Sequence, residues 1–322
     1  MNKKKVLVCG ATGFIGRNAA EALAEREDFE VTAVYNNKLP FNNQKINFIK
    51  ADLTKREDVD RVVKGQDILI QMAATTSGAK DIVSKPYIFV TNNVLMNSLI
   101  LRSVFENKIK HFIFPSCTLM YQSSSIPLKE SDFDANKELY KNYFGPGWTK
   151  IYLEKMCEFF SRLGETKFTV LRHSNIYGSH DKFDLEKSHV FGATMTKVLT
   201  AKDGKIIVWG TGEEERDLLY VDDLVDAVVL ALDKQQDKFK LYNVGLGKAT
   251  AIKDLVKKVI DASGKELKIE YDTSKPTIKT SLSLDCTKIK NELGWMPKTS
   301  LEEGIRKTMD WYKSHIQLKE NY

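Results

Sequence analysis

The sequence predicts an α/β protein, with a doubly wound parallel sheet and a smaller α/β lobe toward the C-terminus. Three observations support this fold class. Short runs rich in β-branched and aromatic residues alternate with longer stretches whose apolar residues recur at helical spacing. A glycine-rich turn follows the first of these runs, and the last third of the chain adds further strands and helices. Such alternation is typical of βαβ units, in which helices connect parallel strands.

The first part of the chain is expected to form five strands and two helices. The strands are VLVCG (6–10), FEVTAVY (29–35), INFIKADL (46–53), DILIQMAA (67–74) and HFIFPSC (111–117). The helices are NAAEALAERED (18–28) and REDVDRVVKG (56–65). Each helix lies between two strands, which is the arrangement that a parallel crossover requires.

The rest of the chain continues the pattern. Strands are expected in KFTVLRHSNIYG (167–178), IIVWGTG (206–212), FKLYNVG (239–245) and LKIEYD (267–272). Helices are expected at 190–201, 221–234, 252–262 and 301–314. No low-complexity segment, repeat or Pro/Gly-rich linker separates the parts. We therefore expect the smaller lobe to interleave with the larger domain.

Composition argues against several classes of protein. The net charge of +6 comes from 49 basic and 43 acidic residues spread along 322 positions, without the basic stripe of a nucleic-acid-binding protein. The mild positive charge suits an anionic small molecule. The sequence has no run of 18 apolar residues, and the basic opening is too short for a signal peptide. Four scattered cysteines lack metal-ligand spacing, so we expect a cytoplasmic, reduced, metal-free protein that binds neither membrane nor nucleic acid.

GATGFIG, at residues 10–16, follows the first expected strand and opens a helix. Glycines at 10, 13 and 16 permit a tight turn, close approach of the backbone to a pyrophosphate, and close helix packing. Free N–H groups at the start of the helix attract the same anion. These features predict a dinucleotide-binding (Rossmann) domain. Its predicted cofactor contacts include Gly10, Thr12, Gly13, Phe14, Ile15, Gly16, Ala73, Ala74 and Asn93.

The second strand bears on which dinucleotide binds. An NAD site usually carries a carboxylate at the end of this strand, for the ribose 2′-hydroxyl. No acidic residue occurs between Val31 and Lys50, and the strand is followed by Asn36 and Lys38. Lys38 is either a partner for a 2′-phosphate or an ordinary solvated loop residue. NADP(H) is therefore favoured and NAD(H) stays open. Asp52 and Leu53, after the third strand, are expected to touch the adenine.

These predictions divide the chain into two domains. Residues 1–175, joined again by 215–245, are expected to form the dinucleotide-binding domain. Residues 176–214 and 246–322 are expected to form the substrate-binding lobe.

Several motifs occur in the order in which extended short-chain dehydrogenase/reductases carry them. They are GATGFIG, ADL, MAA, SCTLMY, LRHSNIYG, RDLLYVDDL and the closing LGWMPKTSLEEGI. The chain resembles this family over nearly its whole length, and HDKFDLEKSHV (180–190) resembles a segment of the GDP-L-fucose synthases. The resemblance implies an epimerase/reductase that acts with NADP(H) on a 4-keto GDP-sugar, in the synthesis of surface polysaccharide precursors. It also implies a homodimer.

KNYFGPGWTKIYLEK (141–155) resembles the active-site helix of these enzymes. The family transfers a proton with a tyrosine, whose pKa is lowered by a lysine four residues later. Lys150 matches the lysine, but Pro146 stands in the place of the tyrosine. Three explanations stay open. Tyr143, or else Tyr140, takes over the role; a water, a substrate hydroxyl or Thr118 replaces the phenol; or the redox step is slow or lost.

Further site residues follow from the same resemblance. The hydroxyl that holds the sugar oxygen maps to the Ser116-Cys117-Thr118 turn, with a register uncertain by one residue. Cys117 and His189 match the pair that epimerises beside a 4-keto group, although either could be an ordinary packing residue. The residues expected to bind the nucleotide sugar are Asn175, His180, Phe183 and Arg216.

Two rival functions remain at this stage. The first is a sugar 4-epimerase or dehydrogenase with tightly bound NAD. The second is a non-catalytic sensor that binds a dinucleotide; loss of the tyrosine favours it, whereas the retained Lys150, His189, Asn175 and Arg216 argue against it.

Overall fold

The computed structural model describes residues 3–76, 84–85, 87–185, 187–275 and 277–317. Its main element is a seven-stranded sheet in the order β10-β6-β5-β4-β1-β2-β3, in which all neighbouring strands are parallel. The strands are β1 (Lys4–Cys9), β2 (Phe29–Tyr35), β3 (Ile46–Lys50), β4 (Ile68–Gln71), β5 (His111–Cys117), β6 (Lys167–His173) and β10 (Phe239–Val244). The predicted parallel sheet is confirmed.

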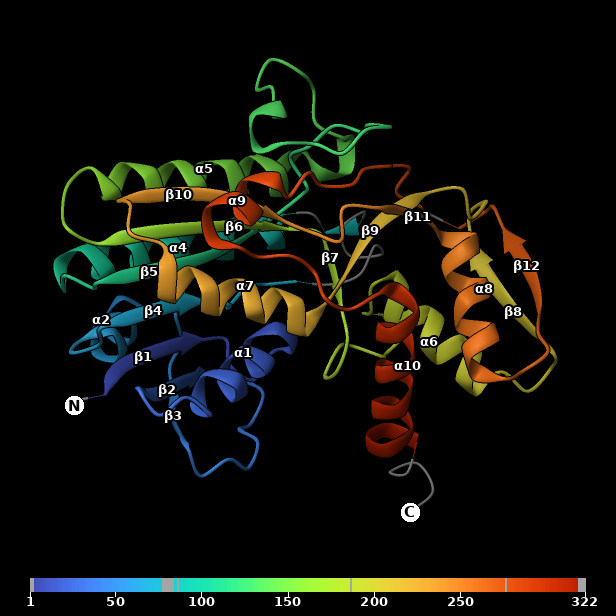
Figure 1. The fold of residues 1–322 in the computed structure, drawn as a ribbon, viewed down its shortest axis with the longest axis horizontal. Helices are drawn as coiled ribbons and strands as arrows, with labels where there is room; N and C mark the ends of the chain where they lie inside the picture. The colour runs from blue at the N-terminus through green and yellow to red at the C-terminus, as the bar shows by residue number, and fades with distance from the viewer. Residues whose placement is uncertain (1–2, 77–83, 86, 186, 276, 318–322) are drawn as a thin grey trace.

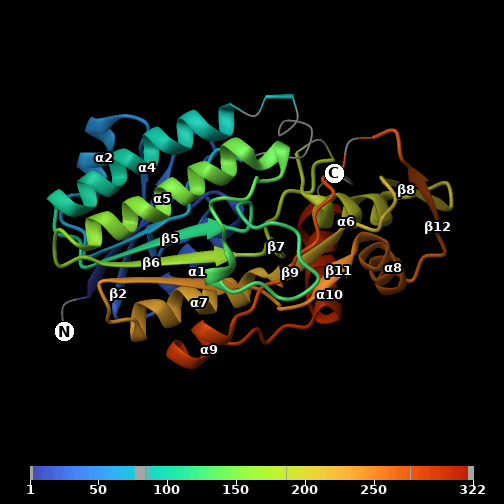
Figure 2. The same cartoon turned by 90° about the horizontal axis from the view of Figure 1, so that it is seen from above.

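Helices cover both faces of this sheet, as the prediction of a doubly wound fold requires (Figure 2). One face carries α2 (Arg56–Val63), α4 (Ile88–Glu106) and α5 (Phe144–Ser161), and the other carries α1 (Phe14–Ala24) and α7 (Val221–Lys234). Side chains that alternate along β1 reach both cores: Val6 and Val8 pack toward α1, and Leu7 packs toward α4. Because both faces of the sheet are buried, the sequences of these strands are continuous apolar runs.

Helix α4 is the long element that sequence patterning did not predict. Polar residues such as Asn93 and Asn97 interrupt its apolar positions, so no clean amphipathic stripe marks the segment. Within the described residues it is the one helix whose length and hydropathy would allow a membrane span, a property that buried core helices share. Its buried face, including Ile100 and Val104, belongs to the core beneath the sheet.

A smaller lobe stands beside the carboxyl ends of the large sheet (Figure 1). It contains α6 (Val190–Thr200), α8 (Ile252–Ser263) and a two-stranded sheet of β8 (Lys205–Trp209) and β12 (Lys268–Asp272). A three-stranded sheet of β7 (Asn175–Tyr177), β9 (Glu215–Tyr220) and β11 (Ala249–Ala251) lies between the two parts. The C-terminal helices are α9 (Thr287–Leu293) and α10 (Leu301–Tyr312), the latter followed by a π-helical turn at Lys313–Gln317.

The strand expected over 167–178 is divided between two sheets. It leaves the large sheet after His173, and β7 pairs with β9 instead. In the segment 215–245, α7 and β10 lie with the large sheet, whereas β9 belongs to the three-stranded sheet. The exact boundaries of the two domains stay a prediction.

A buried ion pair fixes α5 to the sheet. The Arg172 guanidinium, on β6, donates to both carboxylate oxygens of Glu154 at 2.6–3.2 Å, and both side chains are almost fully buried. The hydroxyl of Ser116 donates to the same carboxylate at 2.6 Å. Lys150 lies one turn earlier on α5, so the pair holds the helix that carries this lysine.

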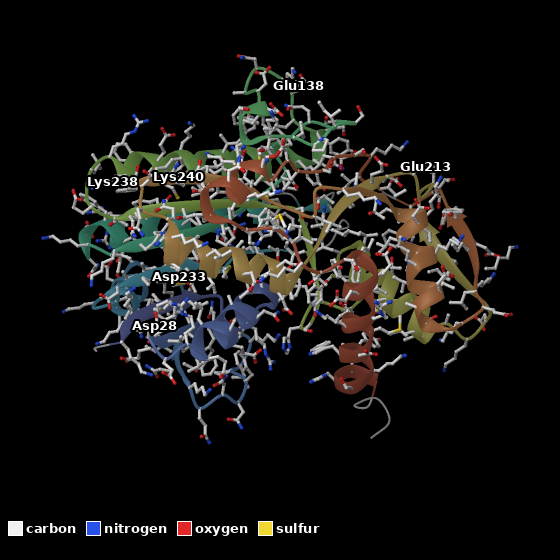
Figure 3. The ribbon with its side chains drawn as sticks, viewed as in Figure 1. Asp28, Glu138, Glu213, Asp233, Lys238 and Lys240 are labelled. Atoms are coloured by element: carbon white, nitrogen blue, oxygen red, sulfur yellow. The ribbon has the colours of Figure 1, made fainter. Side chains whose placement is uncertain are left out.

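Exposed ion pairs join elements elsewhere. Asp28 and Asp233, labelled in Figure 3, both accept hydrogen bonds from Arg26, at 2.9 and 2.8 Å. These bonds link the turn before β2 to the end of α7.

Candidate active site

A cleft of about 1550 Å³ opens where the carboxyl ends of the parallel strands face the smaller lobe. Ligands of open α/β sheets bind at this edge. Pockets for a single drug-sized ligand measure roughly 300–1,000 Å³. The cleft therefore has room for a dinucleotide together with a second molecule.

The glycine turn forms the floor of one end of the cleft. Gly10 has a φ of +70°, and a Cβ there would lie 2.5 Å from the Cα of Ala73. A Cβ on Gly16 would lie 2.2 Å from the carbonyl oxygen of Gly10. Helix α1 starts at Phe14 with no side chain capping its N–H groups. The backbone N–H groups at the start of α1 therefore have no side-chain cap where a pyrophosphate would bind. The residues present thus fit a dinucleotide.

The next part of the cleft is lined by the loops after β2 and β3. Asn36, Lys38, Asp52 and Leu53 all border it, and the Asp52 carboxylate accepts two hydrogen bonds from Thr54. These bonds lower the pKa of Asp52.

Lys38 stands at the mouth of the cleft near a second cation. Partial desolvation by the cleft wall, and secondly the charge of Arg17, lower the pKa of Lys38. Arg17 is itself paired with Glu21 at 3.0 Å and lies over the ring of Phe41. Positive charge therefore gathers where an NAD site would place a carboxylate.

The loop after β4 forms an adjoining wall. Ala73, Ala74 and Asn93 border the cleft. The Asn93 amide accepts a hydrogen bond from the N–H of Thr75 at 2.9 Å and donates to the Thr75 carbonyl at 3.2 Å. This exchange fixes the backbone that faces the glycine turn.

The turn after β5 settles the uncertain register. Cys117 and Thr118 border the cleft, whereas Ser116 is fully buried on the opposite side against Glu154. Ser116 is therefore corrected from a site residue to a support of the buried ion pair, because successive strand side chains point to opposite faces. Burial raises the pKa of the Cys117 thiol, and the nearby Lys150 opposes that shift.

Lys150 projects from α5 into the same region. Its ammonium donates to the Pro115 carbonyl at 3.1 Å and lies 4.8 Å from the centre of the Phe114 ring. Its charge also acts on the Cys117 thiol and on the imidazole of His173.

Pro146 occupies the first turn of α5, where a missing N–H costs nothing. The preceding Tyr143 borders the cleft, and its phenol is influenced by Arg216 and Cys117. Burial raises the pKa of Tyr143. The Tyr140 hydroxyl instead accepts a hydrogen bond from the N–H of Lys279, at 3.4 Å. Of the two tyrosines, Tyr143 is the one that the fold brings to the cleft.

His189 lies directly before α6 and borders the cleft from the side of the lobe. Burial, and secondly the charge of Lys182, lower its pKa. The Lys182 ammonium reaches across to Thr76, where it donates to the carbonyl at 3.2 Å and to the hydroxyl at 3.1 Å.

His180 and Phe183 do not border the cleft. The ring of His180 packs at 4.8 Å against Trp311, and its Nε2 lies 3.6 Å from the Glu21 carboxylate. Phe183 is buried between Trp311 and Tyr312. Their predicted contact with substrate is therefore corrected: both side chains pack against α10, which no local sequence pattern reveals.

Asn175 and Arg216 border the cleft at the end near the lobe. The Arg216 guanidinium donates to the carbonyls of Glu215, Ile278 and Thr280 at 2.5–2.7 Å. The arginine is thereby held in one orientation beside Tyr143.

The structure adds His173, which the sequence analysis did not single out. It ends β6, opposite Cys117 of β5, and borders the cleft. Its position at the carboxyl end of a predicted parallel strand was the one available signal.

Residues 6–245 match the model of the NAD dependent epimerase/dehydratase family. A GDP-L-fucose synthase of Azorhizobium caulinodans is 28% identical over 96% of this chain and 96% of its own length. A GDP-L-colitose synthase of Yersinia pseudotuberculosis is 27% identical over 96% and 97% of the two chains.

Solved structures support the same grouping. A UDP-glucose 4-epimerase from Thermotoga maritima, determined with UDP-glucose, superposes with a TM-score of 0.85 at 27% identity, covering 96% of this chain and 99% of its own. A UDP-N-acetylglucosamine 4-epimerase from Methanobrevibacter ruminantium gives the same TM-score at 26% identity, covering 98% and 100% of the two chains.

Proposed function

The chain belongs to the NAD dependent epimerase/dehydratase family, and from this premise we propose that it is an NADP(H)-dependent epimerase/reductase of a 4-keto GDP-sugar. One observation carries the proposal. A single cleft brings the glycine turn, Lys150 and the Cys117–His189 pair together with an oriented arginine, Arg216. The curated relatives named for GDP-sugar products support the choice of nucleotide.

The cofactor part of the proposal depends on charge. Backbone N–H groups at the glycine turn would hold the pyrophosphate, and Lys150 would hold the ribose beside the nicotinamide. Lys38 and Arg17 would pair with a 2′-phosphate, which a carboxylate in the same place would repel. When bound, the nicotinamide supplies the hydride for the redox step.

The epimerisation part depends on two groups in suitable protonation states. The lowered pKa of His189 keeps its imidazole neutral, so that it can take a proton from the carbon α to the keto group. The raised pKa of Cys117 keeps its thiol protonated, so that it can deliver a proton to the opposite face. The sugar is then inverted, and solvent returns both groups to their starting forms.

A specific observation favours a second candidate function. The two solved structures described above are 4-epimerases of UDP-sugars. The alternative is therefore a UDP-sugar 4-epimerase with tightly held NAD. Membership of an enzyme family weighs against the dinucleotide-binding sensor.

The proposal includes a homodimer formed through α4 and α5. Leu95, Tyr152 and Phe159 expose apolar side chains on these two helices, at 43–50% of their full area. A cytoplasmic location stays a prediction.

The function is tested by mixing the protein with NADPH and GDP-4-keto-6-deoxy-mannose in deuterated water. Nicotinamide absorbance and deuterium uptake into the sugar are followed together. We expect both signals. Deuterium uptake without oxidation would indicate an epimerase that lacks the redox step. If neither signal appears, and UDP-glucose with NAD is epimerised instead, the second candidate function replaces the first.

Replacing Lys38 with Ala is expected to raise KM for NADPH about tenfold or more, and to leave KM for NADH within about twofold. The reason is that a charge-assisted hydrogen bond contributes roughly 1.5–3 kcal/mol, and 1.4 kcal/mol is tenfold in affinity. Steady-state kinetics with each cofactor measure the ratio. Lys45→Ala is the control, because Lys45 is an exposed lysine paired with Glu25. Equal changes for the two cofactors would contradict a 2′-phosphate site.

A further inference from the structure

His173 lies where the chemistry of the cleft is concentrated. It is the last residue of β6, its backbone is in register with Cys117 of β5, and its side chain borders the cleft. Lys150 and His189 are the charged or titratable groups whose fields reach its ring. The residue therefore stands among the groups to which proton transfer is assigned.

The hydrogen bond of His173 fixes its tautomer. Nδ1 lies 2.8 Å from the carbonyl oxygen of Ser174. A carbonyl oxygen can only accept, so Nδ1 carries the hydrogen and Nε2 keeps a lone pair. Within the residues that the structure describes, this is the one hydrogen bond of the ring. Nε2 is thus a proton acceptor without a partner at the wall of the cleft.

The charge state of His173 agrees with this assignment. Burial lowers its pKa to about 4, and the charges of Lys150 and His189 act in the same direction against the bond to Ser174. The ring is therefore neutral in the free protein at neutral pH. When it does gain a proton, that proton is readily given up.

Pro146 stands one turn before Lys150 and carries no proton-transferring group. The phenol of Tyr143 has Arg216 and Cys117 as its influential neighbours, and its pKa is raised rather than lowered. Lys150 acts instead on His173.

We propose that Nε2 of His173 exchanges the proton of the sugar hydroxyl in the redox step, in the role that a tyrosine fills elsewhere in the family. This inference rests on the proposed function. In the oxidative direction Nε2 would take the proton of the breaking O–H bond, and the oxidised nicotinamide dinucleotide, when bound, would supply the acceptor for the hydride from the C–H bond. In the reductive direction Nε2 of the neutral ring must first take a proton from solvent, and the imidazolium would then give that proton to the new alkoxide.

Two substitutions test the roles of Nδ1 and Nε2 separately. In His173→Asn, the amide nitrogen can still donate to the Ser174 carbonyl, but nothing occupies the place of Nε2. In His173→Gln, a side chain reaches the place of Nε2 without a titratable group. His315→Asn is the control, because His315 is an exposed histidine stacked on Trp311. Tyr143→Phe tests the rival phenol.

The first measurement is single-turnover oxidation of NADPH with the 4-keto GDP-sugar, alongside deuterium uptake. General acid–base catalysis contributes about 10²–10⁴-fold. We expect His173→Asn and His173→Gln to lose at least about a hundredfold in the redox rate and to keep deuterium uptake within about threefold. Tyr143→Phe should retain far more of the redox rate than His173→Asn does. A wild-type redox rate in His173→Asn, or loss of the redox step in Tyr143→Phe alone, would overturn the proposal.

The second measurement does not depend on turnover. Two-dimensional NMR of ¹⁵N-histidine-labelled protein reports the tautomer of each ring, and the resonances that vanish in His173→Asn belong to His173. We expect Nδ1–H with an unprotonated Nε2 from about pH 6 to 8, and a shift of the Nε2 resonance when GDP-L-fucose is added. An Nε2–H tautomer would overturn the inference. If wild type acts on no substrate tested, the proposed function has failed, and the tautomer still decides whether Nε2 is free to accept a proton.

Discussion

Replacing Lys150 with Met is expected to lower the rate of the redox step by about a hundred- to ten-thousand-fold while the protein stays folded. Methionine preserves the apolar stem but removes the ammonium that, in the proposed function, would hold the ribose beside the nicotinamide. The lost hydrogen bond to the Pro115 carbonyl should cost only about 1 kcal/mol of stability. Single-turnover absorbance and urea denaturation measure the two effects separately.

Lys155→Met is the matched control. Lys155 lies on the same helix, is exposed, and pairs with Glu158 at 2.9 Å. Its replacement should change neither the redox rate nor the deuterium uptake by more than about twofold. If Lys150→Met left the redox rate near that of wild type, the assignment of this cleft as the redox site would be wrong.

Replacing Glu154 with Gln is expected to lower the free energy of unfolding by about 3–5 kcal/mol. The substitution keeps the shape of the side chain but leaves the Arg172 guanidinium buried without a counter-ion. A loss of this size is a large fraction of the roughly 5–15 kcal/mol that stabilises an ordinary protein. The shift of the urea midpoint, at unchanged slope, measures it.

Glu158→Gln provides the comparison, because Glu158 is on the same helix and pairs with Lys155 and Arg162 in exposed ion pairs. It should cost no more than about 1 kcal/mol. The double variant Glu154→Leu/Arg172→Met should recover part of the loss, since apolar residues can replace a buried pair. Similar losses in Glu154→Gln and Glu158→Gln would argue against the buried pair as a support of the site.

The sequence was enough to predict the parallel sheet and the glycine turn that borders the cleft. Backbone contacts at Gly10 and Gly16 leave no room for a Cβ, so only glycine fits at these positions. A requirement of this kind can be recognised directly in a sequence. In the Ser116-Cys117-Thr118 turn, the sequence predicted which side chain faces the cleft only to within one residue. On a strand, one residue decides between the cleft and the opposite face.

Other residues depend on contacts that no local pattern records. His180 and Phe183 were assigned to the substrate because of their motif, yet their partner, Trp311, lies far along the chain on α10. Helix α4 was not predicted because Asn93 and Asn97 interrupt its apolar pattern. Those amides border the cleft and bond to Thr75 and Gln71.

The hydrogen bonds of Arg216 have a thermodynamic consequence for ligand binding. An arginine that is free to rotate carries about 2 kcal/mol of rotamer entropy, which immobilisation by a ligand removes. Arg216 has already lost that freedom, because three of its five N–H groups are bonded to backbone carbonyls in the described part of the chain. A diphosphate that meets the remaining donors would not have to order the side chain. Calorimetry of nucleoside diphosphate binding would then report a smaller entropic penalty than a flexible arginine imposes.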